Sequence, residues 1–186
     1  MKNELRKEFK KKRANMDKEE VVEKSIKACK VFLESDFYKK SQIIMLYMPL
    51  GNEMDTTDII NSAFKDGKKL VFPVTDEDTG AITPCYATEE SEFEKGGFSV
   101  SEPCDKNVAN VKDIDVVIVP GIVFGENGSR IGFGKGCYDM FLKKTTATKI
   151  GFCYENQLAE HIPGEIYDIK MDYIITEKGL RTCENM

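Results

Sequence analysis

Apolar residues spaced three to four positions apart predict helices in the first third of the chain. A short basic helix is expected over residues 3–14, with Leu5 and Phe9 on one face. A second helix begins after Asp17, whose Asp-Lys-Glu-Glu sequence resembles a capping box with Asp in place of Ser or Thr. The spacing of its apolar residues predicts that one stripe faces the core, namely Val22, Ile26, Cys29 and Leu33.

Short apolar runs bounded by turn residues predict the strands, at residues 43–47, 70–73, 82–87, 116–119, 149–153 and 173–176. Between them, one helix is expected from Asp55 or Thr56 to Gly67, and another over residues 138–144. This alternation predicts an α/β fold with a three-layer, open, mostly parallel sheet and helices on both faces, which is a Rossmann-like arrangement. We expect residues 1–186 to form a single domain.

Two loops leave the carboxyl ends of predicted strands, at residues 48–53 and 121–136. Ligands in open α/β sheets bind at these ends, so we expect the two loops to face one crevice. The acidic stretch at residues 89–94 is expected to be exposed.

The composition describes an ordinary soluble protein, with 41% hydrophobic and 32% charged residues. No apolar run approaches the roughly 18 residues that a membrane span needs, and the start of the chain is charged. The six cysteines form no C-x-x-C pair, which indicates free thiols in a reducing compartment, so a cytoplasmic location is expected. A single histidine excludes a plausible zinc site but leaves room for a hard cation on carboxylates.

The net charge of −5 conceals an uneven distribution. Residues 1–13 carry seven Lys or Arg and two Glu, a net charge of +5, so residues 14–186 sum to −10. A basic helix on an acidic body is a solvated face, a nucleic-acid arm or a clamp on an anionic ligand. An acidic body repels a phosphate backbone, so no nucleic-acid partner is expected. Since no apolar run is long enough to span a membrane, no membrane partner is expected either. We also expect a monomer.

The segment after the fourth predicted strand has the composition of a phosphate site. Gly132, Gly134 and Gly136 allow backbone N–H groups to approach an anion, while Arg130 and Lys135 add a planar fork and a point charge. The spacing fits neither G-x-x-x-x-G-K-[ST] nor G-x-G-x-x-G, so the loop belongs to no standard class. A flexible surface turn is the alternative, which the interleaved charges make less favoured.

The whole segment is similar to a family signature. Pro120-Gly121, Phe124 and the run Gly128-x-Arg130-Ile-Gly-x-Gly-Lys-Gly-x-Tyr-Asp139 resemble the motif of 5-formyltetrahydrofolate cyclo-ligases. Three more segments resemble that family in the same order, and the resemblance spans nearly the full chain. They are Lys2-x-x-Leu5-Arg6, Tyr47-Met-Pro-x-x-x-Glu53-x-Asp55-Thr56 and Ile162-Pro163-x-Glu-x-Tyr-Asp168-x-x-Met171-Asp172.

The resemblance implies an enzyme that uses ATP to convert 5-formyltetrahydrofolate, a reduced folate, to 5,10-methenyltetrahydrofolate, with release of ADP and phosphate. It implies an ATP-binding set of Lys2, Asn3, Glu4, Leu5, Arg6, Arg130, Ile131, Gly132, Phe133, Gly134, Lys135, Gly136, Cys137 and Tyr138. It implies a substrate-binding set of Met48, Glu53, Phe133, Gly134, Lys135, Gly136 and Cys137. The implied catalytic residues are Arg130, Lys135 and Tyr138, and the implied ligands of the cofactor Mg²⁺ are Asp139 and Asp168.

The chain departs from the family pattern at three positions. Cys137 stands where a Tyr is usual, Phe133 where Tyr or Arg is frequent, and Gly125 where Asp is frequent. These differences concern the fine geometry of the substrate site more than the phosphate chemistry. Cys137 is read as an inert small side chain, with a reactive thiol as the alternative.

The residues by themselves leave other interpretations open. Asp139 could be a helix cap, Asp168 an exposed loop acid, and Lys2 and Arg6 surface residues. Two other functions compete: a non-catalytic regulator that has kept the nucleotide loop, and a sugar-phosphate isomerase or acyl-transferase on a similar fold. The presence of Glu53, Asp139 and Asp168 argues against a non-catalytic regulator. An isomerase or acyl-transferase would not need ATP, so nucleotide hydrolysis distinguishes it from a cyclo-ligase.

Overall fold

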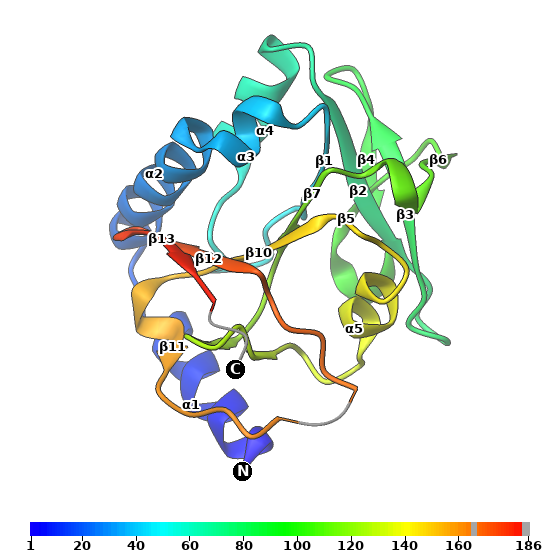
Figure 1. Ribbon diagram of the computed structural model, residues 1–186. Coiled ribbons are helices and arrows are strands. Elements are labelled where there is room, and N and C mark those ends of the chain that lie inside the picture. The colour runs from blue at the N-terminus through cyan, green and yellow to red at the C-terminus, as the bar shows by residue number, and fades with distance from the viewer. Residues whose placement is uncertain (165–166, 184–186) are drawn as a thin grey trace.

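A computed structural model describes residues 1–164 and 167–183, and its centre is an eight-stranded sheet (Figure 1). From edge to edge the strands are β13 (Gly179–Thr182), β12 (Tyr173–Thr176), β10 (Thr148–Phe152), β7 (Val116–Val119), β1 (Ile43–Met45), β2 (Lys69–Thr75), β3 (Ile82–Ala87) and β6 (Asn107–Val108). The strands from β12 to β2 run parallel, while β13, β3 and β6 are antiparallel to their neighbours. The predicted α/β fold with a large, mostly parallel sheet is therefore confirmed.

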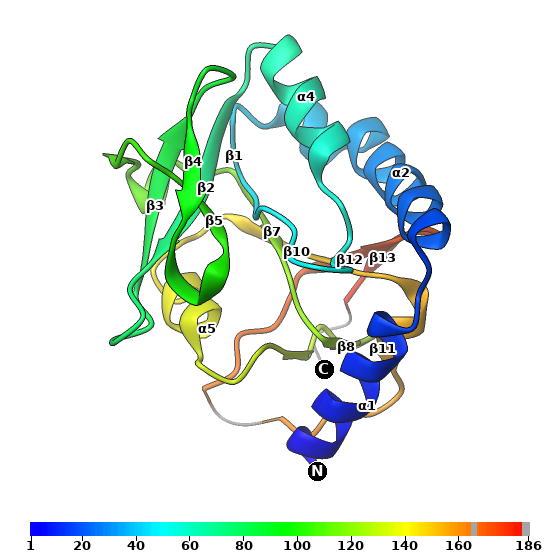
Figure 2. The ribbon, with the colours of Figure 1, turned by 180° about the vertical axis from the view of Figure 1, so that it is seen from behind.

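Helices cover the two faces of this sheet unequally. One face carries α2 (Lys18–Glu34), α3 (Asp36–Lys40) and α4 (Thr57–Lys65), whereas the other carries the short α5 (Cys137–Leu142), as Figures 1 and 2 show. Successive strand residues point to opposite faces, so Ile44 packs with Phe32 of α2 while Met45 packs with Phe141 of α5. Each face thus has its own apolar cluster.

The first helix, α1 (Lys2–Ala14), lies apart from this layered body (Figure 1). Its Phe9 packs against Val123 and Ile131, which belong to a small sheet of three short strands. These strands are β11 (Leu158–Ala159), β8 (Val123–Gly125) and β9 (Arg130–Ile131). The helix is therefore attached to the segment that follows β7.

Smaller elements complete the fold. A hairpin of β4 (Phe93–Lys95) and β5 (Ser101–Pro103) encloses a 3-10 turn, η1 (Gly97–Ser99). Two further 3-10 turns are η2 (Val111–Asp113) and η3 (Glu155–Gln157). In the part of the chain that the structure describes, no helix is long and apolar enough to cross a membrane.

Local sequence signals placed many boundaries well. The strands predicted at 82–87, 116–119 and 173–176 have those bounds as β3, β7 and β12. Asp17 caps α2 by accepting a hydrogen bond from the Glu20 backbone N–H at 2.8 Å. The elements that the pattern missed are α3, the small sheets and the edge strands β6 and β13, which have too few residues to show a period.

The predicted inward face of α2 was wrong for two of its four residues. Val22 and Ile26 are 55% and 52% exposed, while Cys29 is buried and Leu33 is partly buried. The buried face instead carries Ser25, Ala28, Cys29 and Phe32. Ser25 can point inward because its hydroxyl accepts a hydrogen bond from the Asp55 backbone N–H at 2.9 Å. A satisfied hydroxyl and a large ring therefore set the rotation of the helix.

Candidate functional site

The pocket that collects the predicted residues lies where the loops after β1 and β7 meet, and it has a volume of about 730 Å³. The connection from β1 leads to β2 on one side, whereas that from β7 leads to β10 on the other. The strand order thus reverses between β1 and β7, and ligands bind at such a point in open α/β sheets. The predicted crevice between the two loops is present.

Five separate segments form its wall. The start of α1 supplies Met1, Lys2, Asn3 and Arg6, and the loop after β1 supplies Tyr47, Met48, Leu50 and Glu53. The β2–β5 region adds Pro73, Thr75, Ile82, Phe98 and Val100. The segment after β7 contributes Pro120 and every residue from 130 to 139, and Asp168 closes the set.

The glycine loop is shaped by left-handed backbone and braced by α1. Gly134 and Gly136 have φ values of +108° and +69°, which side-chain-bearing residues rarely adopt, and Gly136 is the N-cap of α5. The Arg6 guanidinium donates from Nε to the Gly132 carbonyl at 2.9 Å. A Cβ at Gly134 would lie 3.6 Å from the same guanidinium. The first helix therefore holds the loop from one side.

Arg130 is buried beneath this loop, with its side chain 4% exposed. Nη1 donates to the Pro120 carbonyl at 3.3 Å, and Nη2 donates to Asp139 Oδ2 at 3.2 Å. Its Nε is one of two buried side-chain polar atoms without a hydrogen-bond partner in residues 1–164 and 167–183. Buried donors are nearly always paired in proteins, so this unpaired N–H group is an exception within the wall of the pocket.

The two predicted metal carboxylates are brought to the same wall. Asp168 Oδ2 accepts from Lys2 Nζ at 2.8 Å, and the backbone N–H of Ile169, its neighbour, donates to Asp139 Oδ1 at 3.2 Å. Both side chains are about a quarter exposed, at 25% for Asp168 and 26% for Asp139. The fold thus joins segments 29 positions apart in the sequence.

Carboxylate oxygens suit a magnesium ion, which usually takes one or two protein carboxylates and completes its shell with waters and phosphate oxygens. Within the residues that the structure describes, no group of three or more His, Cys, Asp or Glu side chains is placed to hold an ion. Asp139 and Asp168 therefore fit an ion that arrives with phosphate groups better than one held by protein alone.

Glu53 is a buried carboxylate in the loop after β1, with a side chain that is 7% exposed. Oε2 accepts a hydrogen bond from the Leu50 backbone N–H at 3.0 Å, and Oε1 lies 3.7 Å from Arg13 Nη1. Burial raises the pKa of Glu53, while the Arg13 charge and the Leu50 N–H group oppose that rise. Burial and the neighbouring groups therefore act on the charge of this carboxylate in opposite directions.

Tyr138 lines the pocket from the first turn of α5. Burial raises the pKa of its phenol well above the ordinary value, with the nearby Glu53 carboxylate adding to the rise and Arg130 opposing it. The Arg130 guanidinium lies over the Tyr138 ring at 5.6 Å from its centre. The phenol is thus kept protonated and can donate a hydrogen bond.

An aromatic residue that the sequence motifs did not indicate also lies at this site. Phe98 lines the pocket, and Lys135 Nζ lies 5.7 Å from the centre of its ring. Phe98 and Ser99 have φ values of +55° and +63°, which are uncommon for residues other than glycine. The only local signal was the Gly96-Gly97 pair, which predicts a turn without saying what it faces.

Comparison with known proteins identifies the family. Residues 1–177 match the 5-formyltetrahydrofolate cyclo-ligase family. The chain belongs to this family. A protein of Schizosaccharomyces pombe named as a probable 5-formyltetrahydrofolate cyclo-ligase is 30% identical over 177 residues, which cover 84% of this chain and 86% of the relative. The resemblance inferred from the four motifs is confirmed.

Solved structures of the same activity class share the fold. The structure of 5,10-methenyltetrahydrofolate synthetase from Aquifex aeolicus is 33% identical, with a TM-score of 0.88, and the match covers 100% of this chain and 94% of that one. The synthetase from Mycoplasma pneumoniae is 25% identical with a TM-score of 0.77, covering 95% and 98%. The cyclo-ligase family fold therefore extends over the whole chain.

Two residues of the set carried over from the family do not reach the pocket. Glu4 is at the surface, where its Oε2 lies 2.9 Å from the Met1 amine. Leu5 is partly buried and packs against the cluster that contains Phe9. Cys137 lines the pocket, but burial raises the pKa of its thiol, which disfavours a reactive thiolate.

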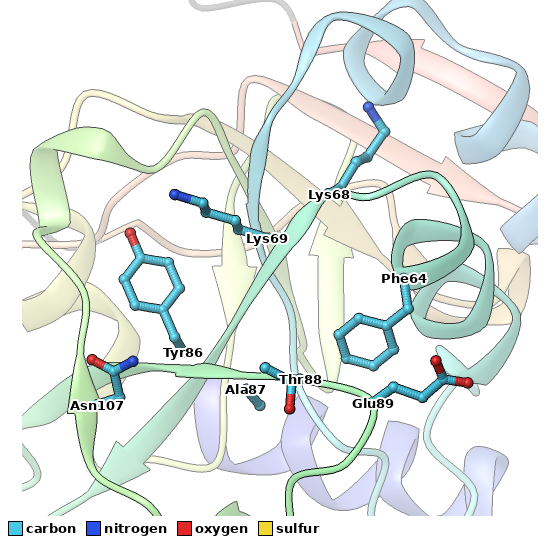
Figure 3. Close-up of a pocket in the computed structure, with 8 residues that line it drawn as sticks. All are labelled: Phe64, Lys68, Lys69, Tyr86, Ala87, Thr88, Glu89 and Asn107. Atoms are coloured by element: carbon cyan, nitrogen blue, oxygen red, sulfur yellow. The ribbon is translucent and has the colours of Figure 1, made fainter.

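A second hollow of about 510 Å³ lies at the beginning of β2 and the end of β3 (Figure 3). Lys69, Tyr86 and Asn107 come together there, and Lys68 Nζ donates to the Ser41 carbonyl at 2.6 Å. None of its polar side chains is buried. The pocket at the loops after β1 and β7, in contrast, contains the buried charged residues Glu53 and Arg130.

Proposed function

We propose that this protein converts 5-formyltetrahydrofolate to 5,10-methenyltetrahydrofolate and that ATP is cleaved to ADP and phosphate in the reaction. We further propose that the pocket at the loops after β1 and β7 is the active site. Membership of the cyclo-ligase family supports the reaction. The observation that carries the assignment of the site is the convergence of Lys2, Arg130, Asp168 and Glu53, from four motifs, on one pocket.

The reaction needs charge neutralisation more than a protein nucleophile. The formyl oxygen attacks the γ-phosphorus of ATP and ADP leaves. The second folate nitrogen then attacks the formyl carbon, loses its proton, and phosphate departs with the formyl oxygen. Arg130 and Lys135 would stabilise the charge that develops on the transferred group, and the backbone N–H groups of the glycine loop would hold the phosphates.

At the other end of the pocket, Glu53 would bind the folate. A pterin edge presents N–H donors, and an ionised carboxylate accepts two of them at once. Met48 would supply an apolar wall beside it. The phenol of Tyr138 has a raised pKa and is near both Glu53 and Arg130. It would therefore donate a hydrogen bond where the formyl group and the phosphate meet. These roles place the folate near Glu53 and the nucleotide near Arg130.

Asp139 and Asp168 would hold a magnesium ion together with the phosphate oxygens of ATP. The ion would supply positive charge at the phosphates when it is bound. Lys2 and Arg130 already pair with these two carboxylates, so they would keep the carboxylates oriented before the nucleotide arrives. Lys2 and Arg6, one helical turn apart, would add positive charge on the side of α1.

We further propose that the enzyme is a cytoplasmic monomer with one catalytic domain over residues 1–186. All six cysteines are free thiols, which supports a reducing compartment. The sheet draws strands from both ends of the chain into one layer, which supports a single folding unit.

The decisive experiment measures the absorbance of 5,10-methenyltetrahydrofolate formed from 5-formyltetrahydrofolate, with ATP and magnesium present together or omitted in turn. Product should require all three. Product formed equally well without nucleotide would contradict the ligase assignment. Nucleotide binding without any turnover would favour a regulator that has kept the loop.

A further inference from the structure

Arg13, near the end of α1, contacts the three segments that shape the folate end of the pocket. Nη1 donates to the Gly121 carbonyl at 3.3 Å in the segment after β7, and it lies 3.7 Å from Glu53 Oε1 in the loop after β1. Its guanidinium carbon lies 5.8 Å from the centre of the Phe133 ring in the glycine loop. One side chain therefore bridges parts of the chain 40 and 108 positions away.

This contact is enclosed, because the Arg13 side chain is only 12% exposed. The backbone around it is also tied to the loop, since Asn52 Nδ2 donates to the carbonyl oxygens of Arg13 at 3.1 Å and Met16 at 3.0 Å. The end of α1 and the loop that carries Glu53 are thus attached at both side chain and backbone. Such a site holds a charge in a defined place.

The other groups that face Glu53 do not neutralise its charge. Tyr47 in the loop after β1 and Tyr138 of α5 are both phenols whose pKa the Glu53 carboxylate helps to raise. The Leu50 backbone N–H is a neutral donor. Among the residues that the structure describes, Arg13 is the cation within 4 Å of the Glu53 carboxylate.

We propose that Arg13 is a positioning residue of the folate site, which holds the Glu53 carboxylate ionised and aligned at the junction of the loops after β1 and β7. Arg13 is not among the residues that line the pocket. It would act through Glu53, because an opposite charge within 4 Å favours the ionised form of a buried carboxylate. The inference rests on the proposed role of Glu53 in binding folate.

The consequence has a definite sign. Without Arg13 the pKa of Glu53 rises further, since burial is then opposed only by the Leu50 N–H group. A smaller fraction of Glu53 is then ionised at any pH near or below its midpoint, so folate affinity falls in that range. The affinity recovers as the pH rises and Glu53 ionises. A role confined to packing would give a loss that does not depend on pH.

The experiment observes Glu53 directly. Protein labelled with ¹³C at the glutamate carboxyl carbons is titrated by NMR without any ligand, and the Glu53 signal is assigned by its absence in Glu53→Gln. In Arg13→Met the midpoint for Glu53 should move up by about one pH unit or more. Arg13→Lys should lie between this variant and the wild type, and it serves if Arg13→Met fails to fold. Lys12→Met, which removes the same charge from an exposed neighbouring position, should leave the midpoint in place.

Binding measurements complete the test. Below the Glu53 midpoint, the Kd for 5-formyltetrahydrofolate should rise about tenfold in Arg13→Met for a shift of one pH unit. The Kd should approach the wild-type value at higher pH, while the Kd for ATP changes little. An unmoved Glu53 midpoint, or a folate loss that is the same at every pH, would overturn the proposal. The two proposals can fail separately. If the Glu53 midpoint shifts in Arg13→Met but the wild-type protein does not bind 5-formyltetrahydrofolate, the proposed function is refuted and the interaction of Arg13 with Glu53 is supported.

Discussion

Replacing Arg130 with methionine separates the catalytic role of this residue from any structural one. The substitution keeps an apolar side chain of similar length in the buried space. It removes the ion pair with Asp139 at 3.2 Å, the donor to the Pro120 carbonyl at 3.3 Å, and the Nε–H group that has no partner in the described part of the chain.

The expected effect on stability is small because the removed terms oppose each other. Loss of the buried ion pair removes an attraction, but it also removes the cost of burying a guanidinium and an unpaired donor, and such exchanges are often neutral. Asp139 is 26% exposed, so water can solvate it afterwards. We expect a change within about 1 kcal/mol, which is a Tm shift of at most about 4 °C for a chain of this size.

The expected effect on catalysis is large. Removing one placed charged contact to a developing phosphate charge typically costs about 2–4 kcal/mol of transition-state stabilisation. That cost corresponds to a fall of roughly 30- to 900-fold in kcat/KM for ATP. The measurement is the initial rate of 5,10-methenyltetrahydrofolate formation at varied ATP, alongside thermal unfolding of both proteins.

Arg181→Met is the matched control. Arg181 makes a bidentate pair with Glu155 at 2.9 and 2.6 Å on the β13 side of the sheet, outside the pocket. Its loss should lower stability slightly and leave the ATP kinetics unchanged. The reasoning about Arg130 is refuted if Arg130→Met unfolds many degrees earlier while the folded fraction turns over ATP at the wild-type rate.

Three further predictions test other parts of the site and the core. Glu53→Gln should weaken folate binding and spare ATP binding in calorimetric titrations, and an equal loss of both affinities would indicate a structural role instead. Because burial raises the pKa of Glu53, this variant should also gain stability relative to the wild type as the pH rises past the usual carboxyl range. Asp139→Asn and Asp168→Asn should each raise the magnesium needed for half-maximal rate, and the double variant should cost less than the sum if one ion is shared; strict additivity would separate the two residues. Ile26→Ser should change the free energy of unfolding by less than about 1 kcal/mol because the side chain is 52% exposed, whereas Phe32→Ala should cost about 3–5 kcal/mol in denaturant titrations, and similar costs would contradict the observed rotation of α2.

The three residues that depart from the family pattern, Gly125, Phe133 and Cys137, lie in the pocket or in the small sheet beside it. Phe133 and Cys137 line the pocket, and a Cβ at Gly125 would lie 2.9 Å from Asn127 Oδ1. That oxygen ends a side chain that can move, so nothing in the structure explains Gly125. Phe133, which is 48% exposed at the pocket, is the departure most open to a ligand.

The sequence alone determined those features that depend on residues close together in the chain. The strand at 116–119 is a continuous run of β-branched residues, which is the pattern of a strand buried on both faces. Asp17 caps its helix through a hydrogen bond to a residue three positions away, so the cap needs no distant partner. The alternating glycines, Arg130 and Lys135 indicated an anion loop because backbone freedom and positive charge occur together within a few neighbouring residues.

Only the tertiary structure decided which distant residues meet. The α2 sequence has two apolar faces, and packing on the sheet selected the one with Ala28 and Phe32 over the one with Val22 and Ile26. Arg13 reads as one more charge on a basic helix, yet it reaches a carboxylate 40 positions away. Such contacts depend on how helices and strands are arranged in space, and no pattern of nearby residues carries that information.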